Sequence, residues 1–274
     1  MQENSALGRA LAVVRDLRNR CPWDREQTRE TLRPYLVEEV LELDAALRDA
    51  DPPRIRDELS DFLLHLAWQF VIAEERGECT PEEIATELEQ KMKRRHPHLY
   101  NLGPAEPWET LKRREGRVGI FEGLPATLPS LQLAYRLQQR AGSVGFDWPD
   151  TVGPVEKVRE ELVEVEAELQ KFSTKPLLAS SEPNAPVSVP DPLVEEIGDL
   201  LFAVVNLARK AHVQPSLALD RANLKFQQRF REVERLALEK GLEVESAGLE
   251  KLDELWEAAK KRQDGKTAGR QDGN

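Results

Sequence analysis

Apolar residues recur at three- and four-residue steps along most of the chain. The spacing is clear at residues 7–17 and again at residues 36–47. Side chains three and four positions apart share one face of an α-helix, so each such segment can bury one stripe against a neighbour. Runs that alternate apolar and polar residues with a period of two are nearly absent. The pattern predicts an all-α protein.

Two segments of the chain occur twice. Leu36–Glu42 (LVEEVLE) reappears as Val158–Glu164 (VREELVE), and Arg56–Leu64 (RDELSDFLL) reappears as Val194–Phe202 (VEEIGDLLF). Repetition of this kind indicates a tandem duplication, in which each copy forms a similar helical bundle. The second copy is longer between its two matching segments, because a proline-rich stretch is inserted there.

This organisation predicts where the domains begin and end. A first helical domain is expected at 1–122, a connector containing GLPATLP at 123–130, and a second helical domain at 131–262. The inserted stretch at 173–192 contains five prolines and is expected to form an extended loop. The tail at 263–274 has almost no apolar residue to bury and is expected to be disordered.

Composition narrows the possible partners. The chain is 40% hydrophobic and 32% charged with a net charge of -11, which argues against a nucleic-acid or membrane-surface binder. No segment approaches the roughly 18 apolar residues that span a bilayer. Cys21 and Cys79 have no CxxC partner, so neither a disulfide framework nor a thiolate zinc site is indicated. A cytoplasmic location is the simplest expectation.

Acidic residues interrupt the apolar runs at regular positions. Glu39 and Glu42 are three residues apart, so they lie on one helix face. Glu58 and Asp61 have the same spacing at the start of the next predicted helix. The short connector at 49–54 makes the two helices antiparallel neighbours, which brings the two acidic pairs face to face. The helix after Asp61 is apolar on nearly every side and is expected to be buried.

The second copy repeats this arrangement of acids. Carboxylates that converge at the edge of a core repel one another, and an uncompensated buried charge costs several kcal/mol. A hard divalent cation such as Mg²⁺, which takes oxygen ligands, would resolve the conflict. A single motif of this kind is more often a solvated helix face or a partner for the helix dipole, but its duplication favours metal binding. The predicted ligands are Glu39, Glu42, Glu58, Asp61, Glu161, Glu164, Glu196 and Asp199.

A di-iron site is a competing use of a carboxylate-lined helical bundle. Such sites typically include a Glu-x-x-His step on two of the helices. The residues three positions before the histidines His65, His96, His98 and His212 are Phe62, Lys93, Arg95 and Arg209. No such step exists, so iron chemistry is disfavoured, and His65 is interpreted as a hydrogen-bonded core residue.

Basic and aromatic residues follow the acids in each copy. Lys225 and Arg229 are four residues apart, and Lys157 lies one turn before Glu161. These cations could offset phosphate charge, although salt bridges along the helix would explain Lys225 and Arg229 equally well. The counterparts in the first copy are Lys91 and Arg95. Trp108 and Trp256 follow, and each could stack on a base or simply pack in the core.

Several motifs together resemble one known family. EExxE followed by ExxD, with CPWDREQT, RRHPHLY, VGFDW, NLKFQQRFREVE and LWEAAK, is similar to the two-repeat members of the MazG family of all-α nucleoside triphosphate pyrophosphohydrolases. The resemblance covers almost the full length. One feature departs from it, because Glu164 and Glu196 are separated by 31 residues, a longer spacing than is usual for the family.

The resemblance implies a function. It implies Mg²⁺-dependent hydrolysis of nucleoside triphosphates to monophosphates and pyrophosphate, by a homodimer that clears non-canonical or excess nucleotides. The eight acids listed above would be the metal ligands, and the second copy would carry the activity. The first copy keeps all four of its matched ligands, so the sequence does not show it to be inactive. The expected nucleotide contacts are Lys157, Glu160, Glu161, Asp199, Lys225, Arg229 and Trp256, with Lys91, Arg95 and Trp108 as their counterparts in the first copy.

Roles in catalysis can be assigned as a hypothesis. Glu160 or Glu161 would take the proton of the attacking water, and Lys225 and Arg229 would offset charge on the leaving pyrophosphate. Two alternatives remain open: a pyrophosphatase restricted to dUTP or a modified nucleotide, and a non-catalytic acidic scaffold that binds a protein partner. The sequence identifies neither the base preference nor a regulatory partner.

Overall fold

A computed structural model describes residues 5–114, 119–171 and 190–271, with the side chains of 113 and 264–271 excepted. The chain divides into two compact units, Met1–Leu111 and Lys112–Asn274, which we describe separately. The described residues form helices and no strands, so the predicted all-α class is confirmed. None of the helices in these residues is long and apolar enough to cross a membrane.

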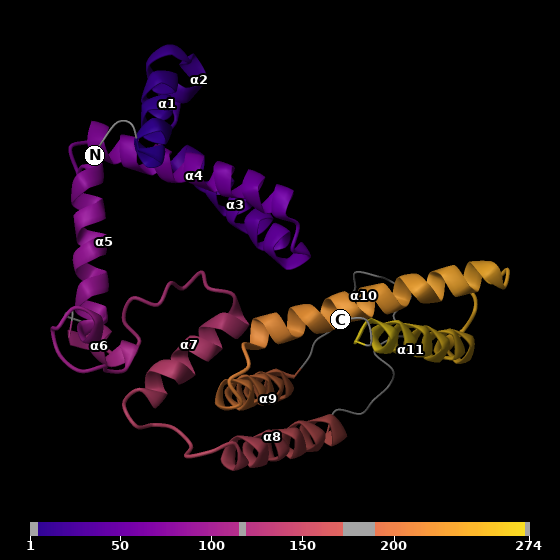
Figure 1. Ribbon diagram of the computed structural model, residues 1–274. Coiled ribbons are helices and arrows are strands. Elements are labelled where there is room, and N and C mark those ends of the chain that lie inside the picture. Colours follow the sequence, from indigo (N-terminus) through magenta and orange to yellow (C-terminus); the bar gives the residue numbers. More distant parts are fainter. Residues whose placement is uncertain (1–4, 115–118, 172–189, 272–274) are drawn as a thin grey trace. The chain divides into compact units, whose positions relative to one another are not determined.

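The elements follow one another along the chain as labelled in Figure 1. The first unit contains α1 (Ala6–Arg20), α2 (Pro22–Glu26), α3 (Arg29–Asp49), α4 (Pro52–Glu75), α5 (Pro81–Arg95) and η1 (Pro97–Leu99), and α6 (Trp108–Arg114) crosses its boundary. The second unit contains α7 (Ser130–Gly142), α8 (Val152–Lys171), α9 (Asp191–Lys210), α10 (Pro215–Glu239) and α11 (Leu249–Gln271).

A tight turn makes α3 and α4 an antiparallel pair. Ala50 ends α3 in the left-handed conformation (φ 51°), and the Asp51 side chain then caps α4 by accepting from the Arg54 amide at 3.4 Å. Pro52 occupies the first turn of α4, where its missing amide proton costs nothing. The turn therefore fixes which residues of α3 face which residues of α4.

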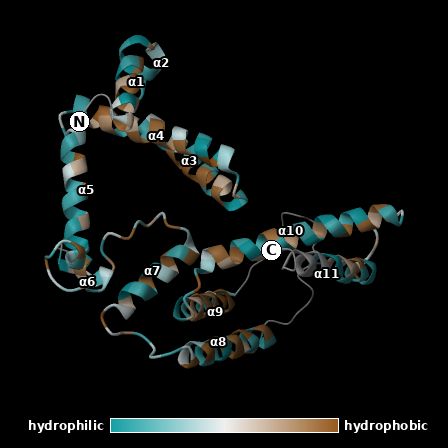
Figure 2. Cartoon of the chain, in the orientation of Figure 1, coloured by the Kyte–Doolittle hydropathy of each residue, from teal (hydrophilic) through white to brown (hydrophobic). Residues whose placement is uncertain are grey.

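The core of the first unit lies between α1, α3 and α4. Leu11 and Val14 of α1 are 1% exposed, and they pack with Leu32 of α3 and with Trp68 and Val71 of α4. Hydrophobic residues are frequent along α4, α8 and α9, whereas α5 is mostly hydrophilic (Figure 2). The apolar stripe of α4 thus anchors the helix pair that carries the first set of acids.

The second unit repeats this helix pairing. Here α8 packs against α9, α7 packs on α9, and α10 pairs with α11 around Val233, Leu236 and Leu255. Most of the predicted loop at 173–192 falls on residues 172–189, which lie outside the described residues. The last two residues of that prediction, Asp191 and Pro192, instead begin α9, because proline is readily accommodated in a first helical turn.

The predicted C-terminal tail at 263–274 overlaps the end of α11, which extends to Gln271. Adding a residue to an existing helix costs far less than nucleating a new one, so a polar sequence can continue a helix without a core of its own. Residues 272–274 lie outside the described part.

The helix after Asp61 is less buried than its sequence predicts. Leu63, Leu64 and Leu66 of α4 remain 37%, 37% and 38% exposed. The reason is that α1 and α3 cover only part of the α4 surface within the first unit. In α9 the corresponding apolar residues are also exposed, with Leu201 at 55% and Val204 at 45%.

The VGFDW segment is clamped to the end of α9. The Arg209 guanidinium donates to both carboxylate oxygens of Asp147, at 3.1 and 2.5 Å. Lys210 Nζ donates to the backbone carbonyl of Trp148 at 2.6 Å. The hydrogen bonds from Arg209, together with its charge and that of Lys210, hold the pKa of Asp147 below its usual range.

Replacing Asp147 with Asn should lower the free energy of unfolding at pH 7 by about 1.5–3 kcal/mol, the range for hydrogen bonds to charged groups. Because the pKa of Asp147 is lowered in the folded state, its contribution is present above the unfolded pKa of about 3.9 and lost as pH falls through the folded pKa. Urea unfolding of wild type and variant, at pH 7 and in acid, measures the difference in the free energy of unfolding.

The variant and the wild type should therefore converge in acid. Asp253→Asn, at an exposed position of α11, is the matched control and should leave unfolding unchanged. Equal stabilities of wild type and Asp147→Asn at pH 7 would show that the contacts of Asp147 with Arg209 and Lys210 do not stabilise the fold.

Candidate metal and nucleotide site

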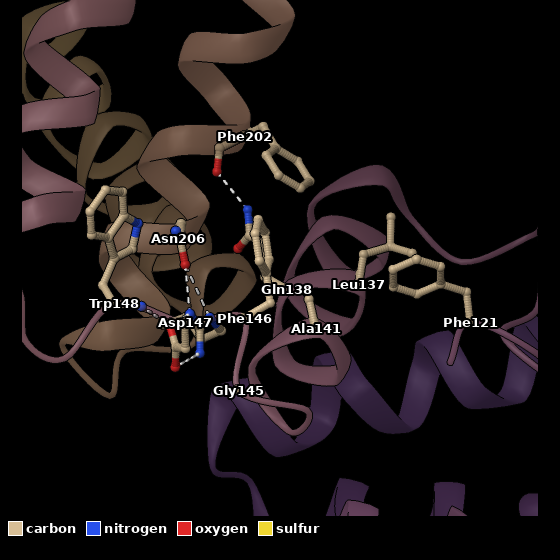
Figure 3. A pocket seen from close by; sticks show the side chains of 11 residues that line it. Phe121, Leu137, Gln138, Ala141, Gly145, Phe146, Asp147, Trp148, Phe202 and Asn206 are labelled. Atoms are coloured by element: carbon tan, nitrogen blue, oxygen red, sulfur yellow. Dashed lines mark hydrogen bonds and ion pairs between the residues drawn. The ribbon is translucent and has the colours of Figure 1, made fainter. Parts of the chain in front are cut away.

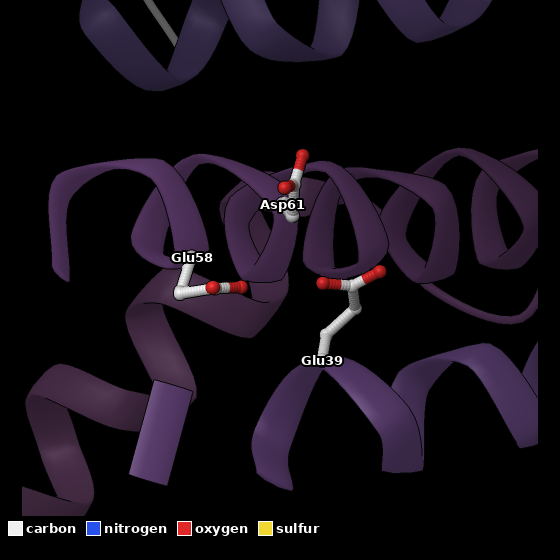
Figure 4. Close-up of side chains that lie close together, drawn as sticks. All are labelled: Glu39, Glu58 and Asp61. Carbon is white, nitrogen blue, oxygen red and sulfur yellow. The ribbon is translucent and has the colours of Figure 1, made fainter. Parts of the chain in front are cut away.

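Three acids meet between α3 and α4 in the first unit. Glu39 extends from α3 towards Glu58 and Asp61 on α4, and one carboxylate oxygen from each lies within 4.8 Å of the others (Figure 4). We call this set the first ring. The structure leaves Glu42 outside the first ring, although burial and then the charge of Glu42 raise the pKa of Glu58.

Three acids also meet between α8 and α9 in the second unit. Glu161 and Glu164 of α8 and Glu196 of α9 each place a carboxylate oxygen within 4.8 Å of the others. We call this set the second ring. Asp199, which is exposed on α9, lies outside it. Each unit thus brings together three of the four acids predicted for it, and the fourth differs between the units.

Burial and mutual repulsion raise the pKa of several of these acids. The pKa of Glu39 is raised by burial first and then by the charges of Asp61, Glu42 and Glu58. The pKa of Glu164 is raised by burial and then by the neighbouring Glu161 carboxylate. Groups whose charged form is disfavoured in this way would be relieved by a bound cation.

The central acid of each ring has one buried oxygen without a hydrogen-bond donor. Among the described residues, Glu39 Oε2 and Glu161 Oε2 are both buried and have no partner. Buried polar atoms are normally satisfied, so these two positions need an explanation. A ring of carboxylate oxygens, one of whose acids has a buried oxygen without a partner, fits the ligand set of a hard cation such as Mg²⁺.

A lysine distinguishes the second ring from the first. Lys157 Nζ lies 2.5 Å from Glu161 Oε1 and 2.9 Å from Glu160 Oε1. The two carboxylates raise the pKa of Lys157, Glu161 having the larger effect, so the ammonium stays charged. Glu161 is 4% exposed; its Oε1 contacts the lysine, and its Oε2 is buried without a hydrogen-bond partner among the described residues. Tyr35 stands at the equivalent position in the first unit.

Two further residues near the first ring were not predicted to be there. His65 is 7% exposed, and its Nε2 lies 3.9 Å from Glu39 Oε1. Its Nδ1 has no hydrogen-bond partner among the described residues, so the expected hydrogen-bonded core histidine is buried but only loosely paired. Arg54 Nε lies 3.8 Å from Glu58 Oε1. Arg54 lies four residues before Glu58 on α4, and this spacing is the signal in the sequence that could have predicted the contact.

The predicted basic and aromatic residues of the second unit lie on α10 and α11. Lys225 is exposed on α10, and Arg229 Nε donates to Gln263 Oε1 of α11 at 2.7 Å. Trp256 packs among the core residues of α10 and α11, with its ring 5.2 Å from that of Phe226. The described contacts of Arg229 and Trp256 therefore join the two helices to each other.

The counterparts in the first unit are also engaged by neighbours. Lys91 Nζ lies 3.9 Å from Glu87 Oε1, one turn earlier on α5. The Arg95 guanidinium lies 5.1 Å from the centre of the Trp108 ring. Trp108 is 39% exposed, so part of its surface remains accessible.

Comparison with known proteins agrees with the family resemblance of the sequence motifs. Residues 27–100 match the MazG nucleotide pyrophosphohydrolase domain, and this range includes the whole first ring. A Thermotoga maritima protein named nucleoside triphosphate pyrophosphohydrolase/pyrophosphatase MazG is 40% identical over 249 residues, which cover 88% of this chain and 89% of that protein. The Escherichia coli K12 protein named nucleoside triphosphate pyrophosphohydrolase is 37% identical over 262 residues, covering 91% of this chain and 94% of that protein.

Proposed function

The chain belongs to the MazG family of nucleotide pyrophosphohydrolases, and on that premise we propose that it hydrolyses nucleoside triphosphates to monophosphates and pyrophosphate at the second ring, with Mg²⁺ as cofactor. The observation that carries the proposal is the second ring itself. Glu161, Glu164 and Glu196 bring one carboxylate oxygen each within 4.8 Å of the others, and Glu161 Oε2 is buried without a partner among the described residues. This arrangement is electrostatically costly without a cation.

The residues of the second ring have distinct roles in the proposed reaction. Glu161, Glu164 and Glu196 hold the cation, and Asp199 lies one helical turn beyond Glu196. An Mg²⁺ ion held by these three acids would supply Lewis-acid chemistry, offsetting charge on the phosphate oxygens and making phosphorus more electrophilic. Of the two candidate bases, Glu160 is favoured, because it lies outside the ring and is not committed to the cation. Glu160 orients and deprotonates the attacking water.

Cations of the chain offset the charge of the substrate. Lys157 lies beside Glu160 and Glu161, where its ammonium can move from the carboxylates to a phosphate oxygen. Lys225 and Arg229 are proposed to stabilise the leaving pyrophosphate. The first unit has Tyr35 at the position that corresponds to Lys157, and this difference supports assigning catalysis to the second unit. The first ring would then be a metal site of lower or no activity.

Product analysis tests this function. The purified chain is incubated with Mg²⁺ and a panel of canonical and modified nucleoside triphosphates, and the products are separated by ion exchange. We expect monophosphate and pyrophosphate in equal amounts. Diphosphate and orthophosphate would contradict attack at the α–β bond, and activity on a single nucleotide alone would favour the narrower pyrophosphatase.

We also propose that the chain forms a homodimer. Val194, Ile197, Leu201 and Val204 form an apolar stripe on α9 and are 42–55% exposed. Stripes of this kind on a folded chain commonly mark an interface. Light scattering should give twice the chain mass of 31.2 kDa. A monomeric mass would contradict the proposal.

A further inference from the structure

His65 lies beside the first ring with both of its ring nitrogens poorly paired. The residue is 7% exposed, and its Nδ1 has no hydrogen-bond partner among the described residues. Its Nε2 lies 3.9 Å from Glu39 Oε1, which is too long for a hydrogen bond. Buried polar groups are normally hydrogen-bonded, so the position of this imidazole needs an explanation.

The distance between His65 and Glu39 is suitable for two ligands of one metal ion. A divalent transition metal such as Zn²⁺ binds imidazole nitrogen and carboxylate oxygen at about 2.0–2.2 Å, so two such donors on one ion lie about 3–4 Å apart. The 3.9 Å between Nε2 and Oε1 falls in this range. Glu39 belongs to the first ring, so an ion held there could take a nitrogen ligand as well as oxygen ligands.

Helix geometry places His65 in line with the acids of α4. Glu58, Asp61 and His65 are separated by three and then four residues, so they form one row along the helix. Glu39 extends from α3 towards the acids of this row (Figure 4). Trp68 of α4 packs in the apolar core, which holds the row opposite α3. The chain therefore positions the imidazole next to the first ring before any ion binds.

The second ring has no matching histidine. The position that corresponds to His65 is Ala203, which is 6% exposed on α9. The preceding residue, Phe202, lines an apolar cavity between α7 and α9 (Figure 3). The central acid of the second ring is instead contacted by the ammonium of Lys157. The two rings thus differ in their donors, with nitrogen available beside the first and carboxylate oxygen alone in the second.

A nitrogen donor changes which ion a site prefers. Mg²⁺ is a hard ion that takes oxygen ligands in near-ideal octahedral geometry. Imidazole suits divalent transition metals, whose affinity for a given site generally rises from Mn²⁺ through Co²⁺ to Cu²⁺. A first ring that includes His65 should therefore discriminate against Mg²⁺ more strongly than the second ring does.

We propose that the first ring is a transition-metal site, in which Glu39, Glu58 and Asp61 supply oxygen ligands and His65 Nε2 supplies a nitrogen ligand. The second ring remains the Mg²⁺ site of the proposed function. The inference goes beyond that function, because it requires only that the first ring binds a cation and not that the second ring hydrolyses a nucleotide. Since the ligands come from both α3 and α4, the bound ion would join the two helices.

Metal titration of variants that keep one ring tests the proposal. Of the two rings, Glu161→Gln leaves the first intact and Glu39→Gln leaves the second. Isothermal titration calorimetry gives the Kd of Co²⁺ and of Mg²⁺ for each full-length variant. The ratio of the Mg²⁺ Kd to the Co²⁺ Kd should be at least about 10-fold larger in Glu161→Gln, because even residues that only support a metal ligand typically contribute about 10- to 100-fold to affinity. Equal ratios, or no Co²⁺ binding by Glu161→Gln, would overturn the proposal.

A histidine variant separates a ligand from a residue that only positions Glu39. In the Glu161→Gln chain, His65→Gln should raise the Kd of Co²⁺ at least about 10-fold and leave the Kd of Mg²⁺ unchanged. His98→Gln changes an exposed histidine of the same unit and should alter neither value. Equal weakening of both ions by His65→Gln would show that His65 acts through Glu39, and would overturn its assignment as a ligand.

Nuclear magnetic resonance provides a test that does not depend on the folding of a His65 variant. The Glu161→Gln chain is labelled with ¹⁵N-histidine and loaded with Co²⁺. An imidazole that binds the ion through Nε2 carries its proton on Nδ1. Because Nδ1 of His65 is buried, this proton should exchange slowly and give a resonance far outside the usual chemical-shift range. The absence of a shifted histidine N–H would overturn the proposal.

Failure of this metal site can be told from failure of the proposed function. A chain that releases pyrophosphate but shows no shifted histidine resonance with Co²⁺ contradicts the first-ring assignment alone. A chain that shows this resonance and the expected Co²⁺ preference but releases no pyrophosphate contradicts the proposed hydrolysis alone.

Discussion

Replacing Glu161 with Gln should lower kcat/KM for nucleoside triphosphate hydrolysis at least about 100-fold, a loss of about 2.7 kcal/mol in transition-state stabilisation. Glu161 is the most buried acid of the second ring and has an oxygen with no other partner. The amide keeps the shape of the side chain but removes the charge that a cation requires. Pyrophosphate release at saturating Mg²⁺ measures the effect.

Two matched variants make this result specific. Glu166→Gln changes an exposed acid on the same helix and should leave the rate unchanged. Glu39→Gln makes the equivalent change in the first ring and should have little effect if the second unit is catalytic. A large loss in Glu39→Gln with full activity in Glu161→Gln would transfer the chemistry to the first unit.

Mg²⁺ at 100 times its Kd should stabilise each unit by about 2.7 kcal/mol, because the folded ring binds the ion and the unfolded chain does not. For a unit of this size the melting temperature should rise by about 5–10 °C. Calorimetry with and without Mg²⁺ measures the change. Sodium chloride at equal ionic strength is the control for general screening. An acidic scaffold that binds a protein partner would show no such rise.

The pH dependence of the metal-free chain tests the same carboxylates, which destabilise the folded state when they are charged and no cation is bound. The pKa of Glu39 and of Glu164 is raised in the folded state, so the folded chain holds protons that the unfolded chain has released. Stability without metal should therefore fall as pH rises from the unfolded pKa of about 4.3 through the raised values. Mg²⁺ should reverse this slope. The Mg²⁺ response should be lost in the unit whose central acid, Glu39 or Glu161, is replaced by Gln.

Much of this architecture is readable in the sequence. The three- and four-residue steps predict helices, and the short connector at 49–54 predicts that α3 and α4 are antiparallel. These local rules are sufficient to place Glu39 opposite Glu58 and Asp61, because helix geometry fixes which residues share a face. The duplicated motif places Glu161 and Glu196 in the same relation.

The details of each ring depend on side-chain rotamers, which spacing does not determine. Glu42 and Asp199 have the expected spacing, but they lie outside the rings because side-chain direction and local contacts decide which oxygens meet. Lys157 engages Glu161 in one unit, whereas Tyr35, at the matching position of the other unit, carries no positive charge.

The most direct measurement is a titration of the chain with Mn²⁺, a paramagnetic substitute for Mg²⁺, followed by electron paramagnetic resonance. The wild type should bind two ions, Glu161→Gln and Glu39→Gln one ion each, and the double variant none. The absence of saturable binding in the wild type, or an unchanged number of ions in the double variant, would show that these carboxylates are not metal ligands and would contradict the account.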